Sequence, residues 1–261
     1  MVNKIYGYDE DLWYNIIKSN YWTGDRDVDF IDMVLKRKGK FRHIIDLGCG
    51  VGRISNRLAA RGYMITGIDL SRKCVEEAKK IAENLRLMNN IDYIVGDYRT
   101  LFFSKAEFDA AICILASAWK NLDEMKLFLK NLKDKIREGG ILLLVDIVKE
   151  KLLISLFSSP SIQRWFNFND DILSLHTWKY NLTTSMLKTE KEFYKKCGSK
   201  LNYIARVERE YPLYSINDYL KTISIEWNIE DIYDPPLNLM NLDSFNDPWW
   251  AFSLMIVARR I

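Results

Sequence analysis

The chain has 261 residues, of which 48% are hydrophobic, 13% aromatic and 28% charged. This composition is too apolar for an intrinsically disordered chain and too evenly mixed for a collagen-like or fibrous one. Its 38 lysines and arginines nearly balance its 35 acids, which leaves a net charge of +3. Because proteins that bind nucleic acid through its phosphates carry a strong basic excess, this balance argues against nucleic acid as a partner.

The cysteines and the hydropathy pattern predict a reduced, cytoplasmic protein. Cys49, Cys74, Cys113 and Cys197 form no C-x-x-C pair, so we expect neither a metal site nor a disulfide framework. No apolar run approaches the roughly 18 residues that cross a bilayer. The N-terminal stretch also lacks the apolar segment of a signal peptide. We therefore expect no membrane as a partner.

The pattern of apolar residues predicts an α/β core after two N-terminal helices. Those helices lie at residues 9–20 and 25–38 and are rich in aromatic side chains. The core strands are expected at residues 43–47, 63–69, 91–95, 108–114 and 141–147, with helices at 51–60, 71–88 and 122–137. Ser71 is a plausible N-cap, Ile136 belongs to the apolar stripe of the third helix, and Gly139-Gly140 ends it. Continuously apolar strands are typical of a parallel sheet covered on both faces, so an open doubly wound sheet is predicted.

After the core the pattern changes to alternating, strand-like segments. Residues 172–180 and 201–211 are expected to be antiparallel strands added beside the main sheet. Ser215, with Asp218, opens a helix that runs to about residue 226, as a capping box would. Two last strands follow at 229–233 and 251–259.

A glycine-rich motif, Asp46-Leu-Gly-Cys-Gly-Val-Gly-Arg53, is the most informative segment. A predicted strand runs directly into Gly48, Gly50 and Gly52 and then into a helix. Glycines there allow a tight turn and let a ligand approach the backbone closely. The amides at the helix N-terminus suit an anionic group such as a carboxylate or a phosphate. Taken alone, the motif leaves a tight turn without a ligand as an alternative.

Three acids, Asp46, Asp69 and Asp97, end three successive predicted strands. Those ends form the crevice in which open α/β sheets bind ligands. Asp69 can accept both hydroxyl protons of a ribose, a feature that NAD sites share. Asp97 can accept from the exocyclic amine of a base, and Tyr98 can lie against its ring. An NAD oxidoreductase is disfavoured by Asp97 and because Arg53 replaces the third glycine of G-x-G-x-x-G.

In register, these segments resemble the ordered motifs of the class I S-adenosylmethionine-dependent methyltransferases. The resemblance rests on residues 46–53, 67–71, 96–97 and 138–145 and covers roughly 42–148. Residues 211–216, Tyr-Pro-Leu-Tyr-Ser-Ile, are similar to a segment that follows the extra strands in small-molecule members. The resemblance as a whole implies a cytoplasmic methyltransferase that uses S-adenosyl-L-methionine, releases S-adenosyl-L-homocysteine and acts on a small or medium-sized acceptor.

Carried over by position, the resemblance also implies where the cofactor lies. The glycine-loop backbone would hold its methionine part, Asp69 its ribose, and Asp97 with Tyr98 its adenine edge. The residues expected to contact it along the rim are Asp46, Gly48, Cys49, Gly50, Gly52, Asp69, Leu70, Asp97, Tyr98 and Leu115. In the N-terminal segment, Tyr21 would cap the cofactor and Arg26 would meet its carboxylate.

The sequence contains few residues that indicate where the methyl acceptor binds. The Asn/Asp-Pro-Pro-Tyr motif of methyltransferases acting on nucleic-acid bases is missing after the fourth strand, where Ser117 and Trp119 could line the pocket. Trp178 and Tyr214 are further candidates for the acceptor pocket. His176 shares a strand face with Trp178; if that face covers the crevice, His176 could orient the acceptor or accept its proton. A hydrogen-bonded surface histidine is the alternative.

These inferences divide the chain into four parts. Capping helices occupy residues 1–41, a Rossmann-like cofactor-binding core 42–150, an inserted helix and antiparallel strands (a substrate cap) 151–214, and a helix with the last two core strands 215–261. The predicted sheet has seven mostly parallel strands with an antiparallel last strand, plus a small antiparallel β cap. Two alternatives stay open: a non-catalytic cofactor-binding or regulatory module, and a methyltransferase acting on RNA or protein.

Overall fold

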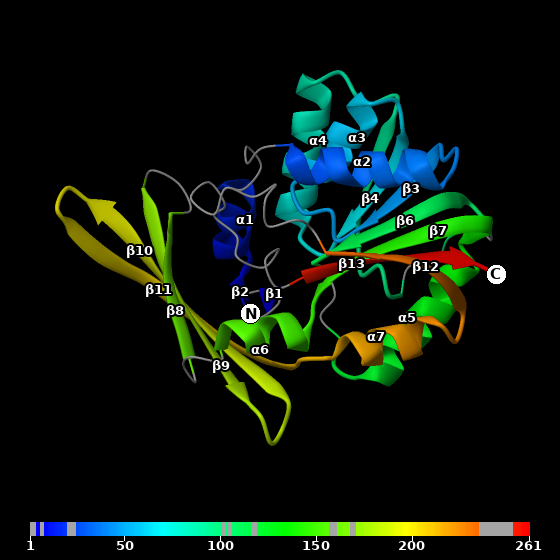
Figure 1. Ribbon diagram of the computed structural model, residues 1–261. Coiled ribbons are helices and arrows are strands. Elements are labelled where there is room, and N and C mark those ends of the chain that lie inside the picture. The colour runs from blue at the N-terminus through cyan, green and yellow to red at the C-terminus, as the bar shows by residue number, and fades with distance from the viewer. Residues whose placement is uncertain are drawn as a thin grey trace.

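The structure, a computed structural model, places its two main β-sheets side by side, with helices around the larger one (Figure 1). It describes residues 4–5, 8–19, 25–100, 103, 106–115, 119–156, 161–167, 171–234 and 253–261. No helix within these ranges is both long and apolar enough to cross a bilayer.

The larger sheet has seven strands in the order β12-β13-β7-β6-β3-β4-β5. Its members are β3 (His43–Leu47), β4 (Met64–Asp69), β5 (Ile91–Val95), β6 (Phe108–Ile114), β7 (Ile136–Ile147), β12 (Trp227–Tyr233) and β13 (Ser253–Arg260). Strands β3 to β7 pair in parallel, and β13 runs antiparallel to both of its neighbours. The predicted fold class, including the antiparallel last strand, is confirmed.

Helices cover both faces of this sheet (Figure 1). One face packs against α2 (Arg26–Lys38), α3 (Arg53–Ala60) and α4 (Arg72–Asn84), and the other against α5 (Leu122–Lys133) and α7 (Ile216–Ile223). Alternate residues of each strand enter the two cores, which is why the strands read as continuously apolar. The expected N-caps are present: Ser71 accepts from the Cys74 amide, and Ser215 forms a capping box with Asp218.

The end of the third core helix differs from the prediction. Helix α5 ends at Lys133, and Ile136, placed on its apolar stripe, instead opens β7 opposite Phe108. Gly139 has φ +74° at an irregularity in the β6–β7 pairing, and a Cβ at Gly140 would stand 2.5 Å from the Asp109 carbonyl oxygen. The two glycines therefore form a bulge inside a strand and do not end a helix.

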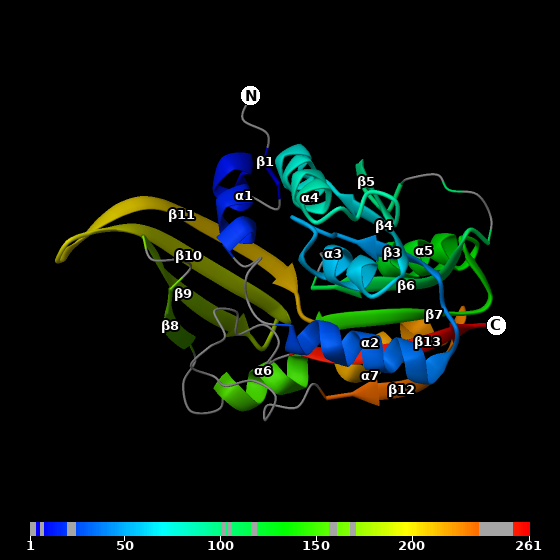
Figure 2. The ribbon, with the colours of Figure 1, turned by 90° about the horizontal axis from the view of Figure 1, so that it is seen from above.

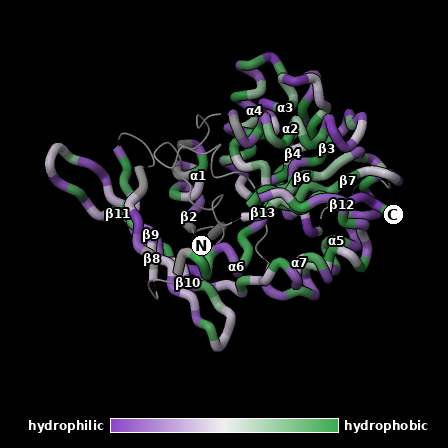
Figure 3. Tube along the Cα trace, viewed as in Figure 1, coloured by the Kyte–Doolittle hydropathy of each residue, from purple (hydrophilic) through white to green (hydrophobic). Residues whose placement is uncertain are grey.

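The smaller sheet, the cap sheet, is an insertion between β7 and α7. It contains four antiparallel strands in the order β11-β10-β9-β8: β8 (Ser161–Asn167), β9 (Ile172–Asn181), β10 (Met186–Cys197) and β11 (Lys200–Pro212). Helix α6 (Lys149–Leu156) precedes it. Strands β9 and β11 were predicted from the sequence. Strands β8 and β10 were not, because their many hydrophilic residues weaken the apolar alternation (Figure 3).

Helix α1 (Glu10–Ser19) lies between the cap sheet and α4 (Figures 1 and 2). The two-residue strands β1 (Lys4–Ile5) and β2 (Tyr8–Asp9) pair just before it. On one side Leu12 and Trp13 pack against Phe193 and Val207 of the cap sheet. Trp13 also belongs to a cluster with Val51 of the glycine motif and Cys74 of α4. Helix α1 therefore packs against the cap sheet on one side and against the glycine motif and α4 on the other.

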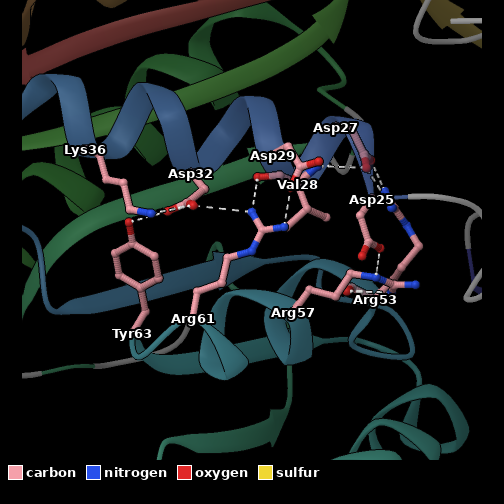
Figure 4. A network of polar contacts seen from close by, with 10 residues as sticks. All are labelled: Asp25, Asp27, Val28, Asp29, Asp32, Lys36, Arg53, Arg57, Arg61 and Tyr63. Carbon is pink, nitrogen blue, oxygen red and sulfur yellow. Dashed lines mark hydrogen bonds and ion pairs between the residues drawn. The ribbon is translucent and has the colours of Figure 1, made fainter. Parts of the chain in front are cut away.

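A ladder of ion pairs joins α2 to α3 and fixes the helix that follows the glycine motif (Figure 4). Arginines at four-residue spacing on α3 face acids of the α2 segment: Arg53 with Asp27, Arg57 with Asp25, and Arg61 with Asp29 and Asp32. The pairs differ in burial. The Asp27 side chain is 4% exposed and binds Arg53 through both oxygens, whereas that of Asp29 is 65% exposed.

We predict that Asp27→Asn lowers the free energy of unfolding by about 1.5–3 kcal/mol, because it removes a charged hydrogen-bond partner from a mostly buried guanidinium. The control Asp29→Asn weakens an exposed pair, which should cost less than about 1 kcal/mol. Urea denaturation of both variants measures the two losses. Equal losses would contradict the burial argument.

Candidate functional site

The glycine motif forms a tight loop between β3 and α3. Gly48, Gly50 and Gly52 have φ of +83°, +56° and +78°, a left-handed conformation that residues with a Cβ adopt only under strain. A Cβ at Gly52 would also stand 2.2 Å from the Tyr93 hydroxyl. The amides of Gly48 and Cys49 both donate to the Ile68 carbonyl, at 2.8 and 2.9 Å. The loop is thereby tied to the tip of β4.

Asp69, at the tip of β4, completes that attachment. Its carboxylate accepts from the amides of Gly50 and Ser71, each at 2.9 Å, and the residue is 6% exposed. Burial raises the pKa of Asp69, and the two backbone hydrogen bonds oppose this change. Each carboxylate oxygen has a second lone pair, so the group can still accept from a ligand's hydroxyls.

Asp46 lies beneath the loop and is 3% exposed. The Ser55 hydroxyl donates to its carboxylate. Burial, together with the nearby charge of Asp69, raises the pKa of Asp46 to about 7, although the Ser55 hydrogen bond opposes this. Its expected supporting role agrees with this place, because Asp46 contacts α3 and does not face solvent.

Asp97 and Tyr98, at the end of β5, have partners within the protein. Arg99 binds both oxygens of Asp97, at 2.9 and 2.7 Å, and also pairs with Glu124. This guanidinium lowers the pKa of Asp97. The Tyr98 ring packs edge-on against Phe128, with centroids 5.5 Å apart. Their contacts with adenine stay predictions, and a base at Asp97 would have to share the carboxylate with Arg99.

The other expected cofactor residues are placed unevenly. Leu70 is half-buried beside Asp69. Leu115 has φ +52°, a strained conformation for a non-glycine residue. Strained backbone of this kind is common in functional sites. The Leu115 amide donates to the Val145 carbonyl at 2.9 Å. Tyr21 and Ser117 lie outside the described residues, as does the side chain of Arg26, the first residue of α2.

Helix α1 covers the glycine loop from the cap side. A Cβ at Gly50 would stand 3.0 Å from the Ile17 side chain. Glu10 accepts from the Ser71 hydroxyl and the Lys73 amide at the start of α4, at 3.1 and 3.3 Å. An acid there stabilises the N-terminus of α4. The expectation that this N-terminal segment covers the site agrees with these contacts.

The cap sheet places His176 and Trp178 in its buried part. His176 is 2% exposed, and its Nε2 lies 3.0 Å from the Ser174 hydroxyl. Burial, helped by the nearby Lys191, lowers the pKa of His176 to about 2. The imidazole is therefore neutral at physiological pH, which suits orienting a partner better than accepting a proton. Trp178 packs with Ile147 and Leu115 at the ends of the core strands.

Beside these residues is a small pocket. Two of its lining residues, Trp119 and Tyr214, were predicted from the sequence to line the acceptor pocket, and the structure brings them together. Asp146 and Tyr219, which also line the pocket and share a hydrogen bond, were not predicted. The position of Asp146 at the end of a predicted parallel strand was the available signal, because such ends line the ligand crevice.

Comparison with known proteins agrees with the motifs. Residues 44–140 match the sequence family described as "Methyltransferase domain". The Ubiquinone biosynthesis O-methyltransferase of Coxiella burnetii is 32% identical over 111 residues, covering 42% of this chain and 45% of the relative. The O-methyltransferase resE of Aspergillus sclerotiorum is 25% identical over 148 residues, covering 52% and 55%. The chain thus matches about half the length of these curated relatives.

Solved structures match over nearly the whole chain. An S-adenosylmethionine-dependent methyltransferase from Clostridium acetobutylicum has a TM-score of 0.69 at 18% identity and covers 97% of this chain and 92% of its own. The sugar N-methyltransferase KedS8 from Streptoalloteichus has a TM-score of 0.68 at 14% identity, covering 100% and 96%. The chain therefore has the fold of the class I S-adenosylmethionine-dependent methyltransferases. Within it, residues 44–140 match the methyltransferase domain, so the resemblance drawn from the motifs is confirmed.

Asp46 should make stability depend on pH. The folded protein keeps a proton on Asp46 up to about pH 7, whereas the unfolded chain releases it near 3.8. The free energy of unfolding should therefore fall as pH rises through this window, by about 2–4 kcal/mol. In Asp46→Asn this decrease should shrink by about that amount and leave only what the raised pKa of Asp69 contributes, as measured by urea denaturation between pH 4 and 7.5. The exposed Asp123→Asn should keep the wild-type decrease, and an undiminished decrease in Asp46→Asn would contradict the assignment.

Proposed function

We propose that the protein transfers a methyl group from S-adenosyl-L-methionine to a small or medium-sized acceptor. One observation carries the proposal: the Gly48–Gly52 loop and the Asp69 carboxylate are joined at the rim of the parallel strands by the Gly50 hydrogen bond. A glycine loop and a carboxylate side by side match a ligand that has both an amino-acid part and a ribose. The family match at residues 44–140 supports the same reading.

The residues present fit that cofactor. At Gly52 a Cβ would collide with Tyr93, so glycine at this position lets the loop pack directly against β5. Asp69 would take the ribose hydroxyls with its remaining lone pairs. When bound there, the cofactor supplies an electrophilic methyl group on a positively charged sulfur.

The chain's own contribution is positioning and the exclusion of water. Correct orientation of two reacting groups is worth up to roughly 7–11 kcal/mol. Leu115, strained at the end of β6, lies in one cluster with Trp178 and Ile147. This cluster would form an apolar floor between the cofactor's methionine part and the cap sheet. Helix α1 would cover the opposite side, since Ile17 and Trp13 already contact the loop region.

The acceptor would enter from the cap side of the rim. Relatives named for ubiquinone biosynthesis and for sugar N-methylation act, by those names, on small molecules, and their likeness supports the same class of acceptor here. The near balance of charge gives no support for a nucleic-acid acceptor. A cytoplasmic location is part of the same proposal.

Asp69→Ala should weaken binding of both S-adenosyl-L-methionine and S-adenosyl-L-homocysteine at least about tenfold, because hydrogen bonds to a charged carboxylate are lost. Isothermal titration calorimetry measures both affinities. Asp92→Ala is the matched control, because Asp92 is exposed on the neighbouring β5. Unchanged affinity in Asp69→Ala would remove the ribose assignment.

A cofactor that binds the wild type tightly without methyl transfer to any member of a broad metabolite set would favour the non-catalytic module instead. Radiolabel transfer from the cofactor is the measurement. Transfer to RNA or protein fractions alone would contradict the small-acceptor proposal.

A further inference from the structure

The pocket at the end of β7 combines one carboxylate with aromatic walls. Its lining is Trp119, Asp146, Ile147, Tyr211, Pro212, Leu213, Tyr214 and Tyr219, from the core rim, α7 and the end of the cap sheet. Among the described lining residues, Asp146 has the only carboxyl group. Burial and nearby acids raise the pKa of Tyr214 and of Tyr219, so both phenols stay protonated.

Two polar groups in this lining have complementary hydrogen-bonding needs. The Asp146 carboxylate accepts from the Tyr219 hydroxyl and from the Ile147 amide, and a carboxylate offers about four acceptor lone pairs in all. Trp119 is 4% exposed, and its buried indole Nε1 has no hydrogen-bond partner among the described residues. An indole N–H only donates, and leaving it buried without an acceptor is costly.

The pocket also lies next to the place where the cofactor's reactive end is expected. Leu115 donates its amide to Val145, the residue before Asp146 on the adjacent strand. Ile147 and Leu213 of the lining belong to one apolar cluster with Leu115 and Trp178. A group held in the pocket would therefore lie beside the proposed position of the cofactor's methionine part.

We propose that this pocket binds a ring-borne hydroxyl of the methyl acceptor, with Asp146 accepting the hydroxyl's hydrogen bond and Trp119 donating to the same oxygen. A hydroxyl oxygen is the simplest group that satisfies both residues at once, because it donates and accepts. A protonated amine would suit Asp146 but cannot accept from Trp119. The flat faces of Tyr211 and Tyr214 suit a ring carrying that hydroxyl. This assignment rests on the proposed function, and it makes the acceptor atom an oxygen.

The transfer step balances with this arrangement. The hydroxyl oxygen forms a bond to the methyl carbon while the carbon–sulfur bond breaks, and its electron pair stays on sulfur. The hydroxyl proton passes to the Asp146 carboxylate. The positive sulfur and the negative carboxylate thus both become neutral, with no other reactant needed. Asp146 acts here as the general base, within hydrogen-bonding reach of the proton it takes.

Fluorine NMR titration tests the assignment with three matched probes: para-fluorophenol, para-fluoroanisole and para-fluorobenzylamine. The phenol should show saturable line broadening with the wild-type protein. The anisole, which lacks only the donated proton, should bind at least about tenfold more weakly because its hydrogen bond to a carboxylate is lost. The amine should bind more weakly than the phenol. Tighter binding of the amine, or equal binding of phenol and anisole, would overturn the proposal.

Two variants separate recognition from a structural role of Asp146. Asp146→Asn should lower the phenol affinity about tenfold and bring it near that of the anisole. Tyr219→Phe removes the partner of Asp146 but keeps the carboxylate, so phenol affinity should be retained. If Asp146 only supported the fold through Tyr219, both variants would lose the probe alike, which would overturn the assignment. Asp123→Asn, exposed on α5, is the matched control and should bind like the wild type.

Calorimetric titration with S-adenosyl-L-homocysteine separates this inference from the proposed function. Asp146→Asn should bind that ligand as the wild type does. If the wild type fails to bind it, the proposed function fails whatever the probes do. If it binds normally while the probes do not discriminate, only the hydroxyl assignment fails.

Discussion

The hydrogen bond from the Gly50 amide to the Asp69 carboxylate is the contact on which the site depends. A glycine loop in a left-handed conformation has little to hold its shape unless its amides find acceptors. Asp69 supplies one at the tip of β4, and the Ile68 carbonyl supplies another to Gly48 and Cys49. The same carboxylate is also the group expected to meet the ribose. Shaping the loop and recognising the ligand are thus assigned to one buried residue, whose substitution should affect both.

Around that contact the chain assembles three separate segments. The core rim presents the loop and the strand-end acids, helix α1 covers the loop through Ile17, and the cap sheet brings Trp178 against Leu115. None of these segments could bury its apolar surface alone. Helix α1 is half in contact with the core and half with Phe193 and Val207 of the cap sheet, so its position depends on both.

The core was predictable from sequence because buried parallel strands and their helices leave strong periodic patterns. The glycine loop, Asp69 and the Ser71 and Ser215 caps are local features, and local spacing revealed them. The features that were predicted wrongly or missed depend on contacts that form only in the folded structure. Ile136 has helical spacing but pairs with Phe108, and Asp97 looked free in sequence although Arg99 occupies it. The pocket that Asp146 lines could not be predicted, because Trp119 and Tyr219, which line it too, are distant from Asp146 in the chain.

The two ends of the cap insertion are joined by hydrogen bonds. The Lys149 amide donates to the Tyr214 carbonyl at 2.9 Å, and Glu150 accepts from the Ile216 amide at 3.0 Å. Because its two ends are held together, the segment between them can change in length or composition with only a small change in the entropy of loop closure. The cap sheet can therefore differ in length or composition while the seven-stranded core keeps its fold.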